Sequence, residues 1–431
     1  MNVSRKTQKI LLYSINFTPE LTGIGKYNGE MVRWLTSQGY EVRVVTVPPY
    51  YPQWKVQSGY SAGKYRKEQI DGAEVWRCPV WVPRQASGLK RIMHLASFAV
   101  SSLPVMLVQM LWRPQLMLVV EPPLAISPAA LILAKIFRIK AWLHVQDFEV
   151  DAAFDLGLLP KKKFLKAVIT GMESKLMQGF NRVSTISQPM LSRLQSKRVP
   201  DKNLVYFPNW VDTTAIYPLP EQTSFRRELG LDQNDFIVLY SGNMGAKQGL
   251  EILLDAAEKL QPYKRIQFLL CGDGQVKETL IQLAAKRKLT NIRFLPLQPL
   301  DKLNELLNTA DVHTLIQKQS ISDLVMPSKL TGMLASGRPV IATAEEDTAV
   351  YNAIMEAEAG WLVPPGDAEG LAECLLRMCY SKSTCSKLGR QAREYAVREL
   401  SMESIMKDFE VSFSGMFDAG QTMHEERLLE R

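Results

Sequence analysis

A glycine-rich loop at residues 241–249 has the composition of a phosphate-binding turn. Gly242, Gly245 and Gly249 follow an apolar strand pattern and precede an amphipathic helix pattern. Glycines let backbone N–H groups approach a phosphate closely, because they have no Cβ. Lys247 lies in the same loop and is placed to supply positive charge. We therefore predict that a diphosphate binds at this loop.

The start of a helix predicted over Ser328–Ala335 offers a second phosphate-binding feature. The order Pro327-Ser328 predicts Ser328 at the N-cap, where its hydroxyl oxygen accepts a backbone hydrogen bond. The free N–H groups of a helix start suit a diphosphate. Lys329 follows directly and competes with Lys247 as the cation that holds the diphosphate. The alternative is a helix start with a structural role only.

Gly23 and Gly25 stand before a helix predicted over Tyr27–Ser37 and invite comparison with the dinucleotide-binding fingerprint. The spacing to Gly29 is one residue longer than that fingerprint requires. The second predicted strand, which ends at Val47, carries no acidic residue for a ribose. A dinucleotide site is therefore not predicted here.

Carboxylates gather directly after the strand predicted over Ala141–Val145. Asp147, Glu149 and Asp151 lie within five positions of one another, whereas His144 falls inside the strand. Carboxylates accept hydrogen bonds from sugar hydroxyls and also bind metals. No Asp-x-Asp triplet occurs in the chain, and lysines and helix termini can meet diphosphate charge. We expect no metal and no other cofactor.

These residues need a scaffold, and apolar runs of strand length alternate with helix patterns throughout the chain. In the first half the predicted strands are Ile10–Asn16, Glu41–Val47, Val75–Val80, Leu116–Val120, Ala141–Val145, Val183–Ile186 and Leu204–Phe207. In the second half they are Phe236–Tyr240, Ile266–Leu270, Ile292–Phe294, Val312–Leu315 and Val340–Ala342. Such alternation predicts an α/β fold with two Rossmann-like, doubly wound parallel sheets. Ligands bind beyond the carboxyl ends of such strands, so we expect an active site in a cleft between the halves.

The chain has 431 residues, which suits two domains of about 200 residues each. We place the first domain at 1–207, a Pro-containing linker at 208–220 and the second domain at 221–400. Residues 401–431 are expected to form a helix that packs back on the first domain, followed by a polar tail.

Composition restricts the partners. The net charge of +8 favours anionic partners. No basic and aromatic motif supports nucleic-acid binding, so none is expected. Five cysteines, an odd count without zinc-ligand spacing, fit reduced thiols. With no signal-peptide pattern at the start, we expect a cytoplasmic protein.

A stretch without charged residues runs from Ile92 to Trp112 between Arg91 and Arg113. Its length would allow it to cross a bilayer. Serines, His94 and Gln109 dilute its hydrophobicity, which favours a buried or interfacial helix over a spanning one. The lysines at 161–163 add a possible contact with anionic lipid. We expect peripheral attachment to the anionic surface of the inner membrane.

Several motifs together resemble family 4 of the retaining GT-B glycosyltransferases. They are GNMGAKQGLEILLDA (242–256), LLCGDG (269–274), ADVHTLI (310–316), DLVMPSKLTGMLASGRPVIAT (323–343), TGIGKYNGEMVRWLTSQGYEVRVVT (22–46) and FPNWVDT (207–213). The resemblance runs from about residue 10 to 400 and is greatest to the group of colanic-acid fucosyltransferases. It implies a GT-B fold, with an acceptor-side first domain and a nucleotide-sugar-binding second domain.

The resemblance also implies roles for single residues. In the family, one carboxylate binds sugar hydroxyls and a second, eight positions later, binds ribose; these places hold Asp323 and Thr331 here. Many members have Arg and Lys where this chain has Asn243 and Gln248. The loop at Gly23 and Gly25 lies over the donor phosphates. At about the place of Asp147, family members have a His or Asp that contacts the donor sugar and helps to arrange the acceptor hydroxyl. We assign this role to Asp147, with Glu149 as the second choice.

By the same resemblance, the donor is a nucleotide sugar, GDP-linked rather than UDP-linked, with GDP-fucose as the best choice. The acceptor is a lipid-linked glycan of colanic acid or a related cell-envelope polysaccharide. Displacement occurs on the front face of the sugar with retention and needs no protein nucleophile. Two alternatives stay open: a GT-B sugar-nucleotide epimerase and a non-catalytic sugar-nucleotide-binding subunit.

Overall fold

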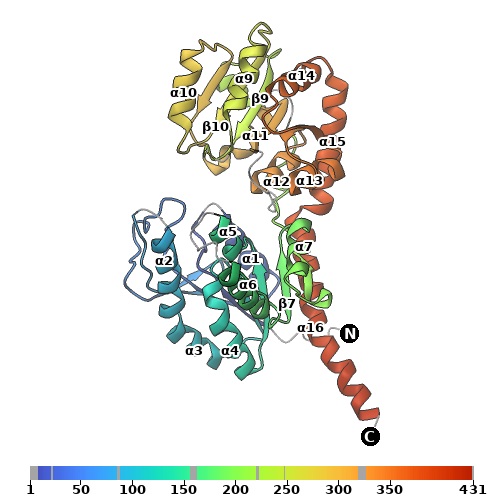
Figure 1. The fold of residues 1–431 in the computed structure, drawn as a ribbon. Coiled ribbons are helices and arrows are strands. Elements are labelled where there is room, and N and C mark those ends of the chain that lie inside the picture. The colour runs from blue at the N-terminus through green and yellow to red at the C-terminus, as the bar shows by residue number, and fades with distance from the viewer. Residues whose placement is uncertain are drawn as a thin grey trace. The chain divides into compact units, whose positions relative to one another are not determined.

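The computed structural model describes residues 8–20, 23–84, 88–155, 163–219, 223–246, 248–318 and 327–429. The chain divides into two compact units, each built around one sheet. Unit 1 comprises Met1–Pro208 together with Met406–Arg431, and unit 2 comprises Asn209–Ile405. Figure 1 shows both units as ribbons.

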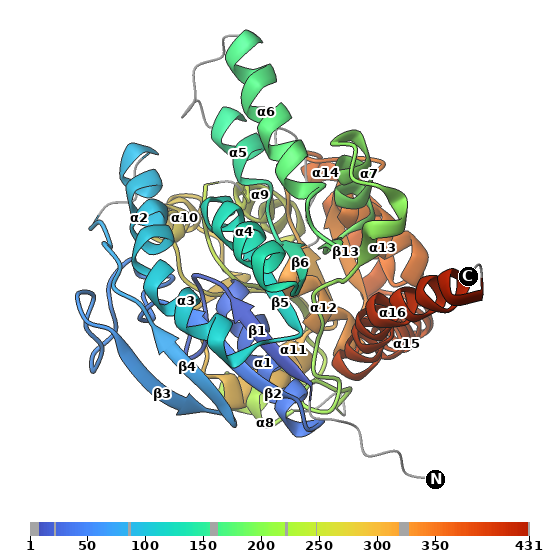
Figure 2. The ribbon, with the colours of Figure 1, turned by 90° about the horizontal axis from the view of Figure 1, so that it is seen from below.

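Unit 1 contains an eight-stranded sheet in the order β3-β4-β2-β1-β5-β6-β7-β8. Its strands are β1 (Lys9–Tyr13), β2 (Glu41–Thr46), β3 (Arg66–Ile70), β4 (Ala73–Arg77), β5 (Leu116–Glu121), β6 (Lys140–Val145), β7 (Arg182–Thr185) and β8 (Leu204–Tyr206). All neighbours are parallel except β3 and β4, which form an antiparallel pair. The predicted parallel sheet thus carries one antiparallel edge strand, β3, next to β4, as Figure 2 shows. The sequence of β3, RKEQI, is mostly charged and polar because an edge strand can face water on both sides.

The helices of unit 1 connect these strands. They are α1 (Gly23–Ser37), α2 (Gly88–Ser101), α3 (Leu103–Trp112), η1 (Leu124–Ile126), α4 (Ser127–Phe137), α5 (Glu149–Asp155), α6 (Lys163–Met177), α7 (Gln188–Ser196) and η2 (Asp201–Asn203). Helix α1 begins at Gly23 and not at Tyr27. Gly23 and Gly25 thus lie in the first turn of α1, and not in a loop before it.

Unit 2 contains a six-stranded, fully parallel sheet in the order β11-β10-β9-β12-β13-β14. Its strands are β9 (Phe236–Ser241), β10 (Ile266–Cys271), β11 (Ile292–Leu295), β12 (Val312–Leu315), β13 (Val340–Thr343) and β14 (Gly360–Val363). This is the 3-2-1-4-5-6 order of a Rossmann sheet, with the reversal of direction between β9 and β12. The central strands are buried on both faces, which explains their unbroken apolar sequences.

The helices of unit 2 cover its sheet. They are α8 (Ser224–Glu228), α9 (Glu251–Leu260), α10 (Lys277–Lys286), η3 (Leu300–Lys302), α11 (Leu303–Thr309), α12 (Ser328–Ala335), α13 (Ala349–Ala357), α14 (Ala368–Cys379) and α15 (Lys382–Glu399). Leucines and alanines of α9 pack with β9 and β10 in the largest hydrophobic cluster of this unit.

The last helix, α16 (Met402–Leu429), joins unit 1 from Met406 onward. The Phe409 ring lies 4.9 Å from the Trp142 ring of β6 and 5.3 Å from the Phe207 ring, measured between centroids. The Tyr40 hydroxyl donates a hydrogen bond to Glu410 at 2.7 Å. These contacts hold the first turns of α16 on unit 1.

Candidate active site

In unit 2 the strand order reverses between the parallel neighbours β9 and β12. In such sheets a crevice forms beyond the carboxyl ends of the strands at this point. The glycine loop that begins at Gly242 follows β9 directly. Lys318 follows β12, and a Cβ on Gly249 would lie only 2.6 Å from Cγ of Lys318. The loop after β9 and the segment after β12 thus meet at the place where this fold binds ligands.

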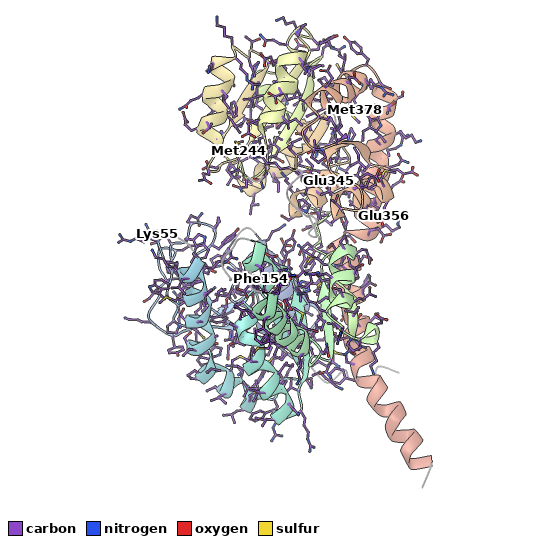
Figure 3. The ribbon with its side chains drawn as sticks, viewed as in Figure 1. Lys55, Phe154, Met244, Glu345, Glu356 and Met378 are labelled. Carbon is purple, nitrogen blue, oxygen red and sulfur yellow. The ribbon has the colours of Figure 1, made fainter. Side chains whose placement is uncertain are left out.

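Tight packing fixes the backbone of the glycine loop. A Cβ on Gly272 would lie 1.9 Å from the carbonyl oxygen of Gly242, and one on Gly274 would lie 2.5 Å from that of Met244. Met244 is fully buried and its backbone N–H donates to the Asp273 carbonyl at 2.8 Å. Figure 3 labels Met244 and so marks this loop. A loop held this firmly keeps its N–H groups in place before a ligand arrives.

Lys329 lies beside the first glycine of the loop. Its Nζ is 4.3 Å from the centroid of the Tyr240 ring, which is a cation–π distance. A Cβ on Gly242 would lie 3.3 Å from Cδ and 3.9 Å from Nζ of Lys329. The structure therefore brings together two predicted ligand-binding residues, Gly242 and Lys329.

Burial lowers the pKa of Lys329 to about 8. A desolvated ammonium is destabilised relative to its neutral form, and an approaching anion would reverse that effect. Lysines with lowered pKa values occur preferentially at functional sites. Lys329 thus has both the position and the electrostatics of a diphosphate-binding group.

Asn243 and Gln248 occupy the places where many family members carry cations. Asn243 is exposed, and its backbone carbonyl oxygen accepts a hydrogen bond from the Tyr240 hydroxyl at 2.6 Å. The Gln248 side chain folds back, and its Oε1 accepts from the Gly245 N–H at 3.1 Å. Both contacts stabilise the loop, and neither residue adds charge. Of the predicted residues, Lys247 and Asp323 lie outside the described residues.

Helix α12 begins one residue earlier than the predicted N-cap implies. Pro327 is the N-cap and Ser328 is the first helical residue, so the prediction of Ser328 as N-cap is wrong. Proline fixes an extended residue at this position, whereas Ser328 already has helical geometry. Thr331 is buried, and its hydroxyl donates to the Ser328 carbonyl at 2.9 Å. The Thr331 hydroxyl is therefore engaged within its own helix.

In unit 1 the corresponding reversal lies between β1 and β5. The loop after β1 carries Glu20, a residue that is not predicted from the sequence. Its carboxylate accepts hydrogen bonds from the N–H groups of Tyr50 and Tyr51, both at 3.0 Å, and from the Asn16 amide at 2.9 Å. A Cβ on Gly25 would lie 2.6 Å from Cβ and Oε2 of Glu20. Gly25 is thus required for close packing of this carboxylate against α1.

Three carboxyl groups gather at the carboxyl ends of β5 and β6. Asp147 is exposed, Glu149 is half-buried and Glu121 is fully buried. The Glu149 Oε2 accepts from the Leu124 N–H at 2.8 Å, so part of its role is to hold the start of η1. Burial, and secondarily the charge of Asp147, raises the pKa of Glu149. Asp147 is therefore the most exposed of the three carboxyl groups.

Burial raises the pKa of Glu121 well above its usual value, and the charge of Glu149 adds to this effect. Asp151 differs, because it pairs with Arg193 at 2.9 Å and Lys197 at 3.2 Å. The two histidines that the sequence placed inside strands are buried, His144 against Ser184 and His313 against Ser336. Burial lowers the pKa of both histidines to about 3, so both are neutral at pH 7.

Comparison with known proteins decides the family. The family described as Glycosyl transferases group 1 matches residues 221–395, and the Glycosyl transferase 4-like domain matches residues 22–210. A relative from Escherichia coli K12, named putative colanic acid biosynthesis glycosyl transferase WcaI, is 42% identical over 93% of this chain and 98% of its own length. The chain belongs to the group 1 glycosyltransferases. The predicted family is thereby confirmed.

A more distant relative and two solved structures agree with this family assignment. Probable glycosyltransferase WbjE of Pseudomonas aeruginosa is 24% identical over 55% of this chain and 59% of its own length. Sucrose-phosphate synthase from Thermosynechococcus elongatus superimposes with a TM-score of 0.74 at 18% identity, covering 96% of this chain and all of the other. Anabaena HepE, solved with UDP and glucose, gives 0.67 at 15% identity, over 95% of this chain and all of the other. Such structural neighbours and the two α/β units confirm the predicted GT-B fold class.

Proposed function

We propose that this glycosyltransferase transfers L-fucose, with retention, from GDP-fucose to a lipid-linked precursor of colanic acid or a related exopolysaccharide. The observation that carries the polysaccharide assignment is similarity to the Escherichia coli relative over nearly the full length of both chains. The choice of fucose and of a GDP donor rests on the motif resemblance to the colanic-acid fucosyltransferase group.

On the donor side, the diphosphate lies against the Gly242 loop and the first turn of α12. Lys329 neutralises it, with Lys247 as a further cation, and the backbone of Asn243, Pro327 and Ser328 frames the phosphates. A preorganised, partly desolvated cation stabilises the charge that develops on the departing GDP. Asp323 binds the sugar hydroxyls in this scheme. Thr331 supports the α12 start from within, because its hydroxyl already donates to Ser328.

On the acceptor side, Asp147 orients the attacking hydroxyl at the end of β6. Glu149 holds η1 in place and sets the charge around Asp147. Gly25 allows the first turn of α1 to lie close to the loop after β1, and a Cβ on Gly23 would lie 3.7 Å from the Tyr51 ring. The attacking hydroxyl approaches the same face of the sugar that GDP leaves, so the anomeric configuration is retained. No metal or other cofactor takes part.

The acceptor carries a lipid, and the enzyme works in the cytoplasm as a peripheral protein of the inner membrane. A lipid-linked substrate is confined to the bilayer surface, so an enzyme that binds this surface meets it at high local concentration. The net charge of +8 favours an anionic leaflet.

Turnover assays test the proposal. Purified protein is incubated with radiolabelled GDP-fucose, UDP-glucose or UDP-galactose and a detergent extract of lipid-diphosphate-linked sugars. We expect labelled lipid from GDP-fucose only, with the α or β configuration of the donor kept in the product. Interconversion of free sugar nucleotides without acceptor would identify an epimerase. Donor binding without any transfer would indicate a non-catalytic subunit.

A further inference from the structure

Helices α2 and α3 form a nearly continuous rod, because Ser102 between them keeps helical dihedrals of φ −77° and ψ −19°. Gly88–Trp112 is 25 residues long, and its apolar window of 18 residues has a mean hydropathy of 1.6. Within the part of the chain that the structure describes, it is the single helical stretch long and apolar enough to cross a membrane. About two fifths of its apolar window is buried inside the protein. The two sides of this rod differ in polarity.

The polar side chains of this rod point inward. His94, Ser102 and Gln109 are buried, and Ser101 is partly buried. In α2, His94 Nδ1 bonds the Trp81 carbonyl at 2.7 Å, and the Ser101 hydroxyl donates to the Pro79 carbonyl at 2.6 Å. Farther along, the Ser102 hydroxyl bonds the Tyr13 hydroxyl at 2.5 Å, and the Gln109 side chain accepts from the Arg43 guanidinium at 3.1 Å. Four polar contacts therefore fix the rod on unit 1 along its length.

The outward side has the opposite character. Every exposed position between residues 92 and 111 is apolar: Ile92, Met93, Ala96, Val100, Leu103, Pro104, Leu107, Val108 and Leu111. Leu111 is 80% exposed and Val100 is 68% exposed. A surface helix of a water-soluble domain has its polar residues on the solvent side, and this rod reverses that arrangement.

Helix α4 extends the same surface. It packs against α3, as Figures 1 and 2 show, and it exposes Ile132 and Ile136 one helical turn apart. Ile136 is 66% exposed. We call the exposed apolar residues of α2, α3 and α4 the apolar face. A patch of this extent on a soluble protein marks an interaction site.

The chain segment that carries the apolar face has almost only positive charges, and an exposed acid from outside it, Glu41, accepts a hydrogen bond from the Trp112 indole at 2.7 Å. Between Val75 and Gln146 the sequence has eight basic residues and one acidic residue, Glu121, whose side chain is fully buried. The exposed cations at the helix ends are Lys90, Arg91, Arg113, Lys135 and Arg138. An apolar surface bordered by cations complements a bilayer with anionic headgroups.

We propose that the apolar face docks on an anionic lipid bilayer, with the α2–α3 rod lying in the headgroup region parallel to the membrane. The inference deepens the proposed function, on which it rests, by assigning the surface through which the enzyme meets its lipid-linked acceptor. A transmembrane orientation is disfavoured because it would break the four polar contacts and expose their partners. The serines and Gln109 that lower the mean hydropathy of the sequence do not weaken the face, because they point away from it.

Co-sedimentation with vesicles tests this docking. The full chain is mixed with vesicles of phosphatidylcholine alone or with about one third phosphatidylglycerol. We expect binding to the anionic vesicles and little binding to the neutral ones. The triple variant Leu107→Glu, Leu111→Glu, Ile136→Glu should bind at least about tenfold more weakly, because each change places a charge against the acyl boundary. The matched control is Leu297→Glu, Met355→Glu, Tyr380→Glu in unit 2, whose side chains are 70%, 56% and 68% exposed and are not part of the apolar face. This control should bind vesicles as the wild type does.

GDP binding, measured on the same samples by thermal shift, shows whether each variant is folded. Loss of vesicle binding with GDP binding retained supports the proposal. Undiminished binding of the triple variant to anionic vesicles overturns it. The proposal is also overturned if the wild-type protein does not bind vesicles but forms a dimer, and the triple variant is monomeric. The apolar face would then join two copies of this chain. Vesicle binding without fucosyl transfer would reject the proposed donor and leave the docking surface intact.

Discussion

The ammonium of Lys329 lies 4.3 Å from the centre of the Tyr240 ring and beside Gly242, at the carboxyl end of β9. None of the ion pairs formed among the described residues includes Lys329. Among these residues no carboxylate offsets the effect of burial on the pKa of Lys329. A diphosphate bound at the Gly242 loop would provide the counter-charge.

Replacing Lys329 with methionine keeps the length of the side chain and removes the charge. We expect the dissociation constant of GDP to rise by roughly 10- to 100-fold, the cost of losing one charge-assisted contact to phosphate. Isothermal titration calorimetry measures this dissociation constant. Lys302→Met, at an exposed lysine that pairs with Glu228, should leave GDP binding unchanged. Equal affinity of Lys329→Met and the wild type would transfer the role to Lys247 or to the backbone.

Donor affinity should fall at high pH. In the proposed function the ammonium of Lys329 binds the diphosphate. Its pKa is about 8, and deprotonation above that value removes the charge. Between pH 7 and pH 9 we expect GDP to bind roughly tenfold more weakly, because about a tenth of the sites then carry the ammonium. Lys329→Met should show no such slope. A flat profile in the wild type would contradict a binding role for the ammonium.

Gly25→Ala tests the packing of α1 against Glu20. The new Cβ would lie 2.6 Å from the Glu20 side chain, so we expect a loss of about 1–3 kcal/mol in the free energy of unfolding. Gly171→Ala in α6 is the matched control, since nothing lies within 4 Å of its Cβ position. That helix-interior change should stabilise by about 0.5–1 kcal/mol. Urea unfolding of both variants gives the comparison, and a neutral Gly25→Ala would reject the packing argument.

Glu121→Gln should stabilise the protein at neutral and alkaline pH. The folded-state pKa of Glu121 is raised by burial, so the folded state keeps a proton that the unfolded chain has lost. Its contribution to stability is complete below the unfolded pKa and is lost as pH rises toward the folded pKa. We expect the variant to match the wild type near pH 4 and to exceed it by about 1–3 kcal/mol at pH 8. Equal unfolding free energies at pH 8 would show that the buried carboxyl is not protonated in the folded state.

Much of the fold follows from local apolar patterns. All twelve strands predicted from apolar runs have counterparts in the structure, from β1 at Lys9–Tyr13 to β13 at Val340–Thr343. Strand β3 was missed because its residues are charged and it is held by pairing with β4, not by an apolar face. The start of α1 was placed at Tyr27 because glycines have low helix propensity, whereas the contact of Gly25 with Glu20 stabilises the earlier turn.

The site was less accessible to sequence reasoning. The Gly242 loop and Lys329 were predicted from their positions next to a strand and at a helix start. Lys318 and Glu20 were not, because the sequence does not reveal that Lys318 packs on Gly249 or that Tyr50 and Tyr51 bind Glu20. For the α2–α3 rod, mean hydropathy could not show which face the polar residues occupy. That depends on tertiary contacts such as Tyr13 with Ser102.

The most direct test of the central claim is a thermal-shift panel of GDP, GDP-fucose, UDP, UDP-glucose and NAD on the purified enzyme. A ligand at about 100 times its dissociation constant should add about 2.7 kcal/mol to the free energy of unfolding. We predict that GDP and GDP-fucose raise the melting temperature of the wild type, and that they raise it much less in Lys329→Met. A shift with the UDP ligands alone would contradict the GDP-fucose donor, and a shift with NAD alone would contradict glycosyl transfer as the function of this site.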